Sequence, residues 1–168
     1  MLLKLSKKDL NNRYYLFGGS TDQVIKFKKK VKNKNIFFFP YISYSRVEKK
    51  IYDVDVCLLP YTSKITVSGN VGDISNYTSP LKVFDYMKLG KLIICSNLSV
   101  LREVLNHKHN CLLIDKFDDE KEWLKLISKV SQNIKKYDNL RKNAYEYAKR
   151  YNLEWRTSKL LSFYYSSN

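Results

Sequence analysis

Short apolar runs separated by longer amphipathic stretches are the feature that most constrains the fold of this chain. Five such runs occupy residues 14–17, 36–39, 54–59, 92–95 and 111–114. Most are continuously apolar and do not alternate with polar residues, and several end at Gly, Pro or a polar residue. Strands of this kind are typical of a parallel sheet that is buried on both faces by helices.

The stretches between these runs carry apolar residues at helical spacing. We expect helices over residues 22–31, 44–54, 80–89, 99–105, 118–130, 137–151 and 153–165. Strands that alternate with helices predict an α/β protein with a doubly wound, mostly parallel sheet and helices on both faces. The 168 residues fit one domain, 1–168. Residues 61–78 form the one long irregular stretch, and loops of that length are often functional.

Charge and cysteine content narrow the function classes. The chain carries 31 Lys and Arg against 16 Asp and Glu, and the first 50 residues alone hold 13 against 3. A basic front end suits a polyanionic partner, although lysine-rich helices with solvated faces explain it equally well. Cys57, Cys95 and Cys111 are scattered, which favours small core residues in a reducing compartment over a disulfide framework. With no signal-like or membrane-spanning run in the sequence, we expect a cytoplasmic protein.

Ligands of such folds bind beyond the carboxyl ends of the strands. Gly18 and Gly19 follow the first apolar run, and residues 40–43 follow the second. Paired glycines let a ligand approach the backbone closely, but a plain turn is the more common reason for such a pair.

The helix expected to begin at Pro80 is the strongest candidate site. Thr78 and Ser79 precede it with hydroxyl groups, Lys82 adds a positive charge, and Asp85 lies one turn further along. Free N–H groups at a helix start favour an anion such as a phosphate. Asp85 could accept hydrogen bonds from a sugar diol. The alternative is that Ser79 only caps the helix and Asp85 is an ordinary exposed residue.

The run Thr-Ser-Pro-Leu-Lys-Val-Phe-Asp-Tyr-Met-Lys-Leu-Gly-Lys at 78–91 closely resembles the donor-binding half of group 1 (family 4-like) glycosyltransferases. The segment at 93–105, with its Leu-Arg-Glu helix, continues that resemblance. So do Asp-Val-Cys-Leu-Leu-Pro at 55–60 and Asn-Cys-Leu-Leu-Ile at 110–114. The resemblance covers roughly residues 12–151.

This resemblance implies a Rossmann-like C-terminal domain of a GT-B enzyme, which transfers a sugar from a nucleoside-diphosphate sugar with retention of configuration. It places Asp85 at the ribose of the donor. The other residues that it implies bind the donor are Gly18, Gly19, Thr78, Ser79, Pro80 and Leu81. It places the base near Tyr41 and Ile42. Tyr77 stands where the family has an acid that contacts the transferred sugar, and with Lys82 it is the expected catalytic pair. The donor is a substrate, so no cofactor is expected, and His107 and His109 lack further ligands for a metal.

The resemblance also implies parts that we do not find in the sequence. The family domain opens with a strand and a diphosphate-clamping turn, so the first strand is expected to be missing, and the acceptor domain is absent. A partner would then supply them, or the chain is an inactive fragment. The C-terminal helices, about 135–168, are expected to pack back across the domain boundary.

Two further partners follow from charge and from the expected pathway. Synthesis of cell-surface polysaccharide or glycolipid, the expected pathway, would suit peripheral contact with the anionic inner face of a membrane. A nucleic-acid-binding module with stacking aromatics (Tyr14, Tyr15, Phe27 and residues 37–39) is the alternative that the basic front end leaves open.

Overall fold

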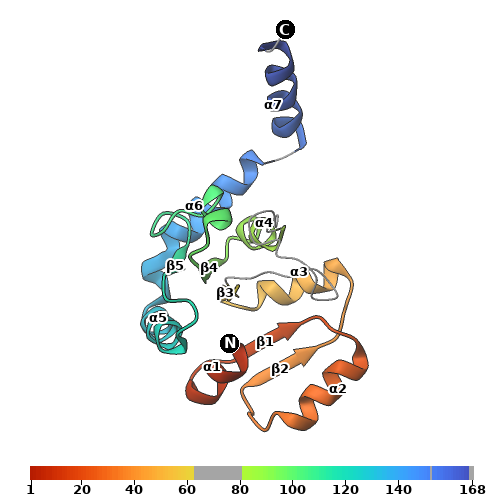
Figure 1. Cartoon of the computed structure of the whole chain (residues 1–168), viewed down its shortest axis with the longest axis vertical. Coiled ribbons are helices and arrows are strands. Elements are labelled where there is room, and N and C mark those ends of the chain that lie inside the picture. The colour runs from red at the N-terminus through yellow and green to blue at the C-terminus, as the bar shows by residue number, and fades with distance from the viewer. Residues whose placement is uncertain (63–80, 152, 167–168) are drawn as a thin grey trace.

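The computed structural model describes residues 1–62, 81–151 and 153–166. Helices and strands alternate through most of this part (Figure 1). The strands are β1 (Tyr14–Phe17), β2 (Ile36–Phe39), β3 (Val56–Leu59), β4 (Leu92–Ser96) and β5 (Leu112–Ile114). The α-helices are α1 (Leu2–Lys8), α2 (Thr21–Lys30), α3 (Tyr44–Tyr52), α4 (Leu81–Lys88), α5 (Glu120–Gln132), α6 (Asp138–Arg150) and α7 (Leu153–Ser166), with 3₁₀ turns η1 (Ser99–Glu103) and η2 (Ile134–Tyr137).

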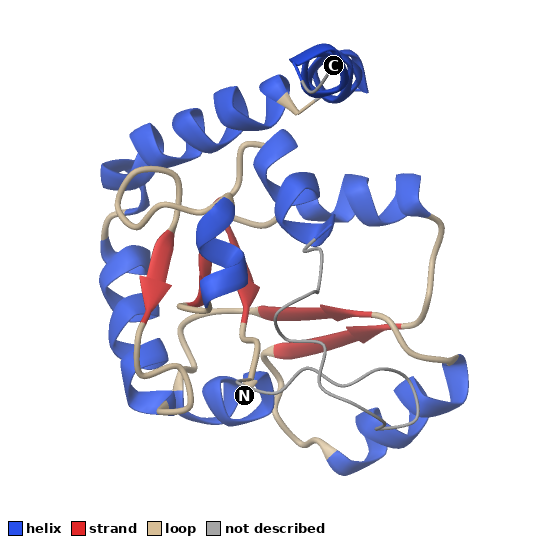
Figure 2. Cartoon of the chain, turned by 45° about the horizontal axis from the view of Figure 1, so that its top comes forward, coloured by secondary structure: helices blue, strands red, loops and turns tan. Residues whose placement is uncertain are grey.

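All pairings between these strands are parallel, which confirms the predicted α/β class. The strands form two sheets, with orders β1-β2 and β3-β4-β5. Figure 2 shows the two groups of arrows side by side. The reason is that no described strand joins β1 to β3.

Helices cover both faces of the three-stranded sheet, as predicted. Leu92 and Ile94 of β4 join a cluster that contains Trp123 of α5, whereas Ile93 and Cys95 join a cluster with α4 and α6. Trp123 is fully buried, and its indole N–H donates to the carbonyl of Phe117 (2.8 Å). Alternate residues of one strand therefore anchor opposite helical layers.

The two C-terminal helices differ in their packing. Ala144 and Ala148 of α6 are buried in the cluster that contains α4, so α6 belongs to this domain. Helix α7 extends away from the other elements and exposes Phe163, Tyr164 and Tyr165 (Figure 1). Packing of α7 against another domain stays a prediction. None of the described helices has the length and apolar character that crossing a bilayer requires.

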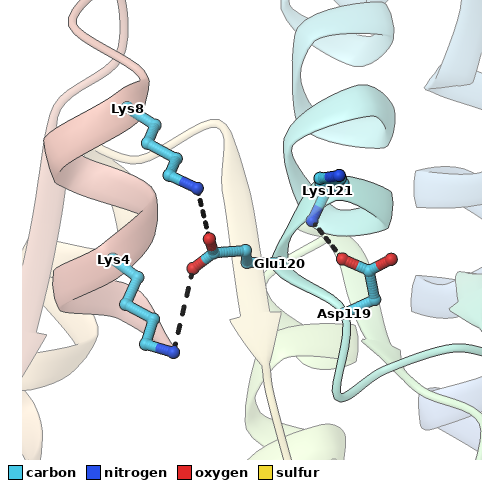
Figure 3. A network of polar contacts seen from close by, with 5 residues as sticks. All are labelled: Lys4, Lys8, Asp119, Glu120 and Lys121. Atoms are coloured by element: carbon cyan, nitrogen blue, oxygen red, sulfur yellow. Dashed lines mark hydrogen bonds and ion pairs between the residues drawn. The ribbon is translucent and has the colours of Figure 1, made fainter.

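Ion pairs join α1 to α5 beside the shared core (Figure 3). The Glu120 carboxylate contacts the ammonium group of Lys8, and its other oxygen lies 4.0 Å from that of Lys4. Asp119 caps α5 by accepting the backbone N–H of Lys121 (2.9 Å). The hydrogen bond from Lys8 and the charges of both lysines hold the pKa of Glu120 below its ordinary 4.5.

We expect this network to make stability depend on pH. A carboxyl group with a lowered pKa in the folded state stabilises the fold above its unfolded pKa, and that contribution is lost as pH falls through the folded value. Glu120→Gln should therefore unfold at lower urea than the wild type at neutral pH, and the gap should close on acidification below 4.5. Glu122→Gln, on the same turn, is the control. A gap that stays constant with pH would contradict the assignment.

Candidate functional site

Most of the predicted donor-binding residues meet around one cavity of about 1300 Å³, called here the central cavity. Gly18, Gly19, Tyr41, Ile42, Lys82 and Asp85 all line it. They come from the ends of β1 and β2 and from the first turns of α4. Pro60 and Tyr61, which follow β3, complete this edge. The carboxyl ends of three parallel strands thus face one space, as expected for a ligand site in this class of fold.

The glycine pair forms a tight exit from β1. Gly18 and Gly19 adopt φ angles of 126° and 85°, which side chains with a Cβ rarely tolerate. The N–H of Gly18 donates to the carbonyl of Phe39 (3.0 Å), and the N–H of Tyr41 donates to the carbonyl of Gly19 (3.0 Å). The plain turn that we considered is therefore present, and close approach of a ligand to this backbone stays a prediction. The turn also brings Tyr41 beside the glycines.

Ser20 then starts α2 with a capping box. Its side chain accepts the N–H of Gln23, and the side chain of Gln23 accepts the N–H of Ser20 (2.9 Å). This reciprocal pair is the usual device for ending a loop and beginning a helix. It makes Ser20 the N-cap of α2 and fixes the position of the glycine turn.

Helix α4 is oriented by its buried face. Val83 and Met87 are fully buried, and they place Lys82, Asp85 and Tyr86 on the cavity side. Leu81 opens the helix but is 71% exposed and does not line the cavity. Its predicted role uses only its backbone, so the exposed side chain does not conflict with that role.

Tyr77, Thr78, Ser79 and Pro80 lie outside the described residues. Their predicted contacts with a donor sugar and its phosphates stay predictions.

Tyr44 is a site residue that we did not predict. Its hydroxyl donates to Oδ1 of Asp85 (2.7 Å) and joins the first turn of α3 to α4 across the cavity edge. This hydrogen bond, helped by desolvation and the negative charge of Asp85, raises the pKa of Tyr44 to about 12. No sequence spacing pointed to the pair, because its members are 41 positions apart on different helices.

The charges around the cavity differ from those of the whole chain. Among the residues that the structure describes, the charged ones in its lining are Arg13 and Lys82 against Glu48, Asp53, Asp55 and Asp85. The lysines of α2 do not line this space. The described lining therefore does not form a broadly positive surface.

The residues considered for a metal or a nucleophile have structural roles. His107 accepts the N–H of Leu113 through Nδ1 (2.9 Å), which holds the loop before β5. Within the described ranges, no group of three or more His, Cys, Asp or Glu side chains could hold a metal ion. All three cysteines are buried, and burial raises the pKa of Cys57 to about 12, so its thiolate is disfavoured.

Comparison with protein families identifies one family. The model for "Glycosyl transferases group 1" matches residues 2–147. No curated protein matches the chain.

Solved structures share the fold at low sequence identity. HepE from Anabaena in complex with UDP-glucose has a TM-score of 0.71 at 14% identity, over 98% of this chain and 44% of that one. Sucrose-phosphate synthase from Thermosynechococcus elongatus has a TM-score of 0.74 at 15% identity, over 99% of this chain and 42% of that one. The C-terminal domain of a group 1 glycosyl transferase (LpcC) from Francisella tularensis has a TM-score of 0.64 at 14% identity, over 89% and 74%. The chain thus spans less than half of the first two and matches a C-terminal domain.

The Tyr44–Asp85 hydrogen bond is open to direct titration. We expect the Tyr44 phenol to titrate near 12, and to return toward the ordinary 10.0 in Asp85→Ala, which removes both the acceptor and the negative charge. Carbon-13 NMR of labelled tyrosine measures this. Lys88→Ala, at the other end of α4, should leave the titration unchanged. A Tyr44 pKa that does not respond to Asp85→Ala would show that the two side chains are not bonded in solution.

Proposed function

We propose a donor-binding role for this chain, which belongs to the glycosyl transferases group 1 family. Its fold is that of the C-terminal domain of such enzymes. We propose that it binds a nucleoside-diphosphate sugar in the central cavity, and that UDP-sugars are the first donors to test, because HepE was crystallised with UDP-glucose. The observation that carries the proposal is that Gly18, Gly19, Tyr41, Ile42, Lys82 and Asp85 line one cavity.

Each part of the donor has a proposed partner in this arrangement. The base lies beside Tyr41 and Ile42, where backbone groups can read its edge. Asp85 accepts hydrogen bonds from the ribose hydroxyls through the oxygen that Tyr44 leaves open, or replaces the Tyr44 contact altogether. The diphosphate lies toward the start of α4, with the glycine turn of β1 on the other side.

The proposed chemistry is retaining transfer to an acceptor hydroxyl. The bond from the anomeric carbon to the diphosphate oxygen breaks, and a bond to the acceptor oxygen forms. Negative charge grows on the leaving diphosphate, so fixed donors and a cation near it stabilise the transition state. Lys82 supplies that cation. The polar groups around the diphosphate come from Thr78, Ser79, Pro80 and Leu81. Tyr77 contacts the transferred sugar.

Turnover requires an acceptor site, and we propose that it lies in a part beyond these 168 residues. The chain covers 44% of HepE and 42% of sucrose-phosphate synthase. Binding of the donor and turnover are therefore separate properties of this chain. An inactive fragment that keeps the fold is the alternative. Cell-envelope polysaccharide or glycolipid synthesis is the pathway that we propose to examine first.

Donor binding is tested by the variants of α4. A ligand that binds only the folded state at 100 times its Kd stabilises it by about 2.7 kcal/mol, so UDP, GDP or ADP should raise the Tm of the wild type. Asp85→Asn should weaken both uridine and UDP at least tenfold, because both carry the ribose. Lys82→Ala should weaken UDP but not uridine, because only UDP carries phosphates.

Lys88→Ala is the matched control, since it removes the same charge from the exposed far end of α4. It should bind like the wild type. Absence of any Tm shift with all three nucleoside diphosphates would contradict donor binding and leave a fold without this activity.

Peripheral contact with an anionic membrane is a second proposal, supported by α2. This helix exposes Ile25 (46%) and Phe27 (48%) beside the exposed lysines 26, 28, 29 and 30. Apolar side chains among lysines are typical of a surface that binds anionic lipid. For the nucleic-acid alternative, Tyr14 and Phe38 are buried in the core, whereas Tyr15, Phe27 and Phe37 are exposed, so this alternative stays a prediction.

Vesicle sedimentation distinguishes binding of α2 to anionic lipid from nonspecific adsorption. Binding should rise with the phosphatidylserine content of the vesicles, and replacing Lys28, Lys29 and Lys30 by Gln should reduce it, since each lysine near such a surface contributes about 1 kcal/mol. The same change at the exposed Lys121, Lys125 and Lys129 of α5 is the control. Binding that ignores anionic lipid, or falls equally in both variants, would contradict the proposal.

A further inference from the structure

A hydrogen-bonded pair, Tyr44 and Asp85, lies at the edge of the central cavity. Tyr44 is the first residue of α3, and Asp85 lies in the middle of α4. The Tyr44 hydroxyl donates to Oδ1 of Asp85 (2.7 Å), and both residues line the cavity. Among the described residues, Tyr44 is the one whose side chain hydrogen-bonds to this carboxylate. Whatever binds Asp85 therefore meets the Tyr44 hydroxyl as well.

The fold gives no packing reason for a tyrosine at position 44. Helices α3 and α4 are held by other residues, because Ile51, Val83 and Met87 are buried. Tyr44 is 61% exposed, so its ring adds little to the core. The hydrogen bond to Asp85 is its polar contact, and it forms where a ligand in the cavity can reach it.

The hydrogen atom shared by this pair belongs to Tyr44. The hydrogen bond to Asp85, with desolvation and nearby negative charge, raises the pKa of Tyr44 to about 12, so the phenol is protonated at neutral pH. A phenol has one hydrogen, and Tyr44 uses it on Oδ1 of Asp85. An ionised carboxylate has none. The pair therefore offers a ligand acceptor positions on the Tyr44 oxygen and on both carboxylate oxygens, and it offers no donor.

A set of acceptors without a donor selects ligand groups that carry hydrogen atoms. Phosphate oxygens are acceptors and negatively charged, and Glu48, one turn after Tyr44 on α3, adds a further negative charge to the cavity lining. This corner of the cavity therefore disfavours the phosphates of a nucleotide. Two neighbouring hydroxyls, as in a ribose, supply two O–H donors at once. A sugar that lacks one of them leaves an acceptor without its hydrogen bond, which costs free energy.

We propose that Tyr44 is a specificity-determining residue that completes the ribose site. Its oxygen accepts a hydrogen bond from one ribose hydroxyl, while Oδ2 of Asp85 accepts one from the other. Tyr44 keeps its own bond to Oδ1 and so holds the carboxylate in place. The pair then distinguishes ribonucleotides from deoxyribonucleotides. This inference rests on the proposed donor binding and adds a second ribose contact to it.

Calorimetric titration with UDP, 2′-deoxy-UDP and 3′-deoxy-UDP tests the proposal on the whole chain. The three ligands share the base and the diphosphate, so their differences in Kd report the ribose contacts alone. The wild type should bind each deoxy form about tenfold or more weakly than UDP, because each leaves one acceptor unpaired.

Tyr44→Phe keeps the ring and removes the oxygen. It should weaken UDP, and it should bind one of the two deoxy forms within about twofold of UDP, because the hydroxyl that Tyr44 contacted no longer matters. The preference against the other deoxy form should remain, since Asp85 is unchanged. Tyr52→Phe is the matched control. It removes a hydroxyl from the exposed last residue of α3, and it should keep both preferences of the wild type.

The outcomes separate this inference from the proposed function. Tighter binding of UDP by Tyr44→Phe would mean that Tyr44 occupies the place of the ribose on Asp85, and it would overturn the proposal. An equal loss for all three ligands, or unchanged preferences against both deoxy forms, would overturn it too and leave donor binding intact. A wild type that binds none of the three would contradict donor binding itself, and the ribose site with it.

Discussion

Burial of Val83 and Met87 is the interaction on which the candidate site depends. Both side chains are fully buried beneath α4, and a helix anchored at two points one turn apart has one orientation. That orientation places Lys82 and Asp85 on the cavity side and leaves Leu81 and Lys88 exposed. The chemistry proposed for α4 thus follows from packing on its opposite face, against β4 and α6.

The second constraint is the separation of the two sheets. The glycine turn and Tyr41 belong to the β1-β2 sheet, whereas α4 packs against the β3-β4-β5 sheet in a separate cluster with α6. The parts proposed to hold the base and those proposed to hold the ribose and phosphates therefore lie on opposite sides of the central cavity. The core around Trp123 contains residues of both sheets, and the ion pairs of Glu120 join α1 to α5 beside it. The hydrogen bond between Tyr44 and Asp85 connects the two sides of the cavity at the edge.

The sequence predicted the local structure well because apolar runs and helix caps are local signals. The parallel strands and the family were both recognisable from short segments. The position at which the strands divide into two sheets was not, because strand pairing depends on which edges meet and not on the strand sequences. Contacts between distant residues, such as Tyr44 with Asp85 and Lys8 with Glu120, had no local signal either. For Tyr77, Thr78, Ser79 and Pro80 the resemblance to the family remains the whole basis of the assignment.

The central claim is that residues from both sheets bind one nucleotide together, and amide NMR tests it most directly. Titration with UDP should shift the amide signals of Gly18, Gly19, Tyr41, Ile42, Lys82 and Asp85 along a single saturation curve, while α5 and α6 stay unchanged. One common curve would mean that both sides of the cavity contact the same ligand. Shifts confined to the lysines of α2, or separate curves for the glycine turn and α4, would contradict the account.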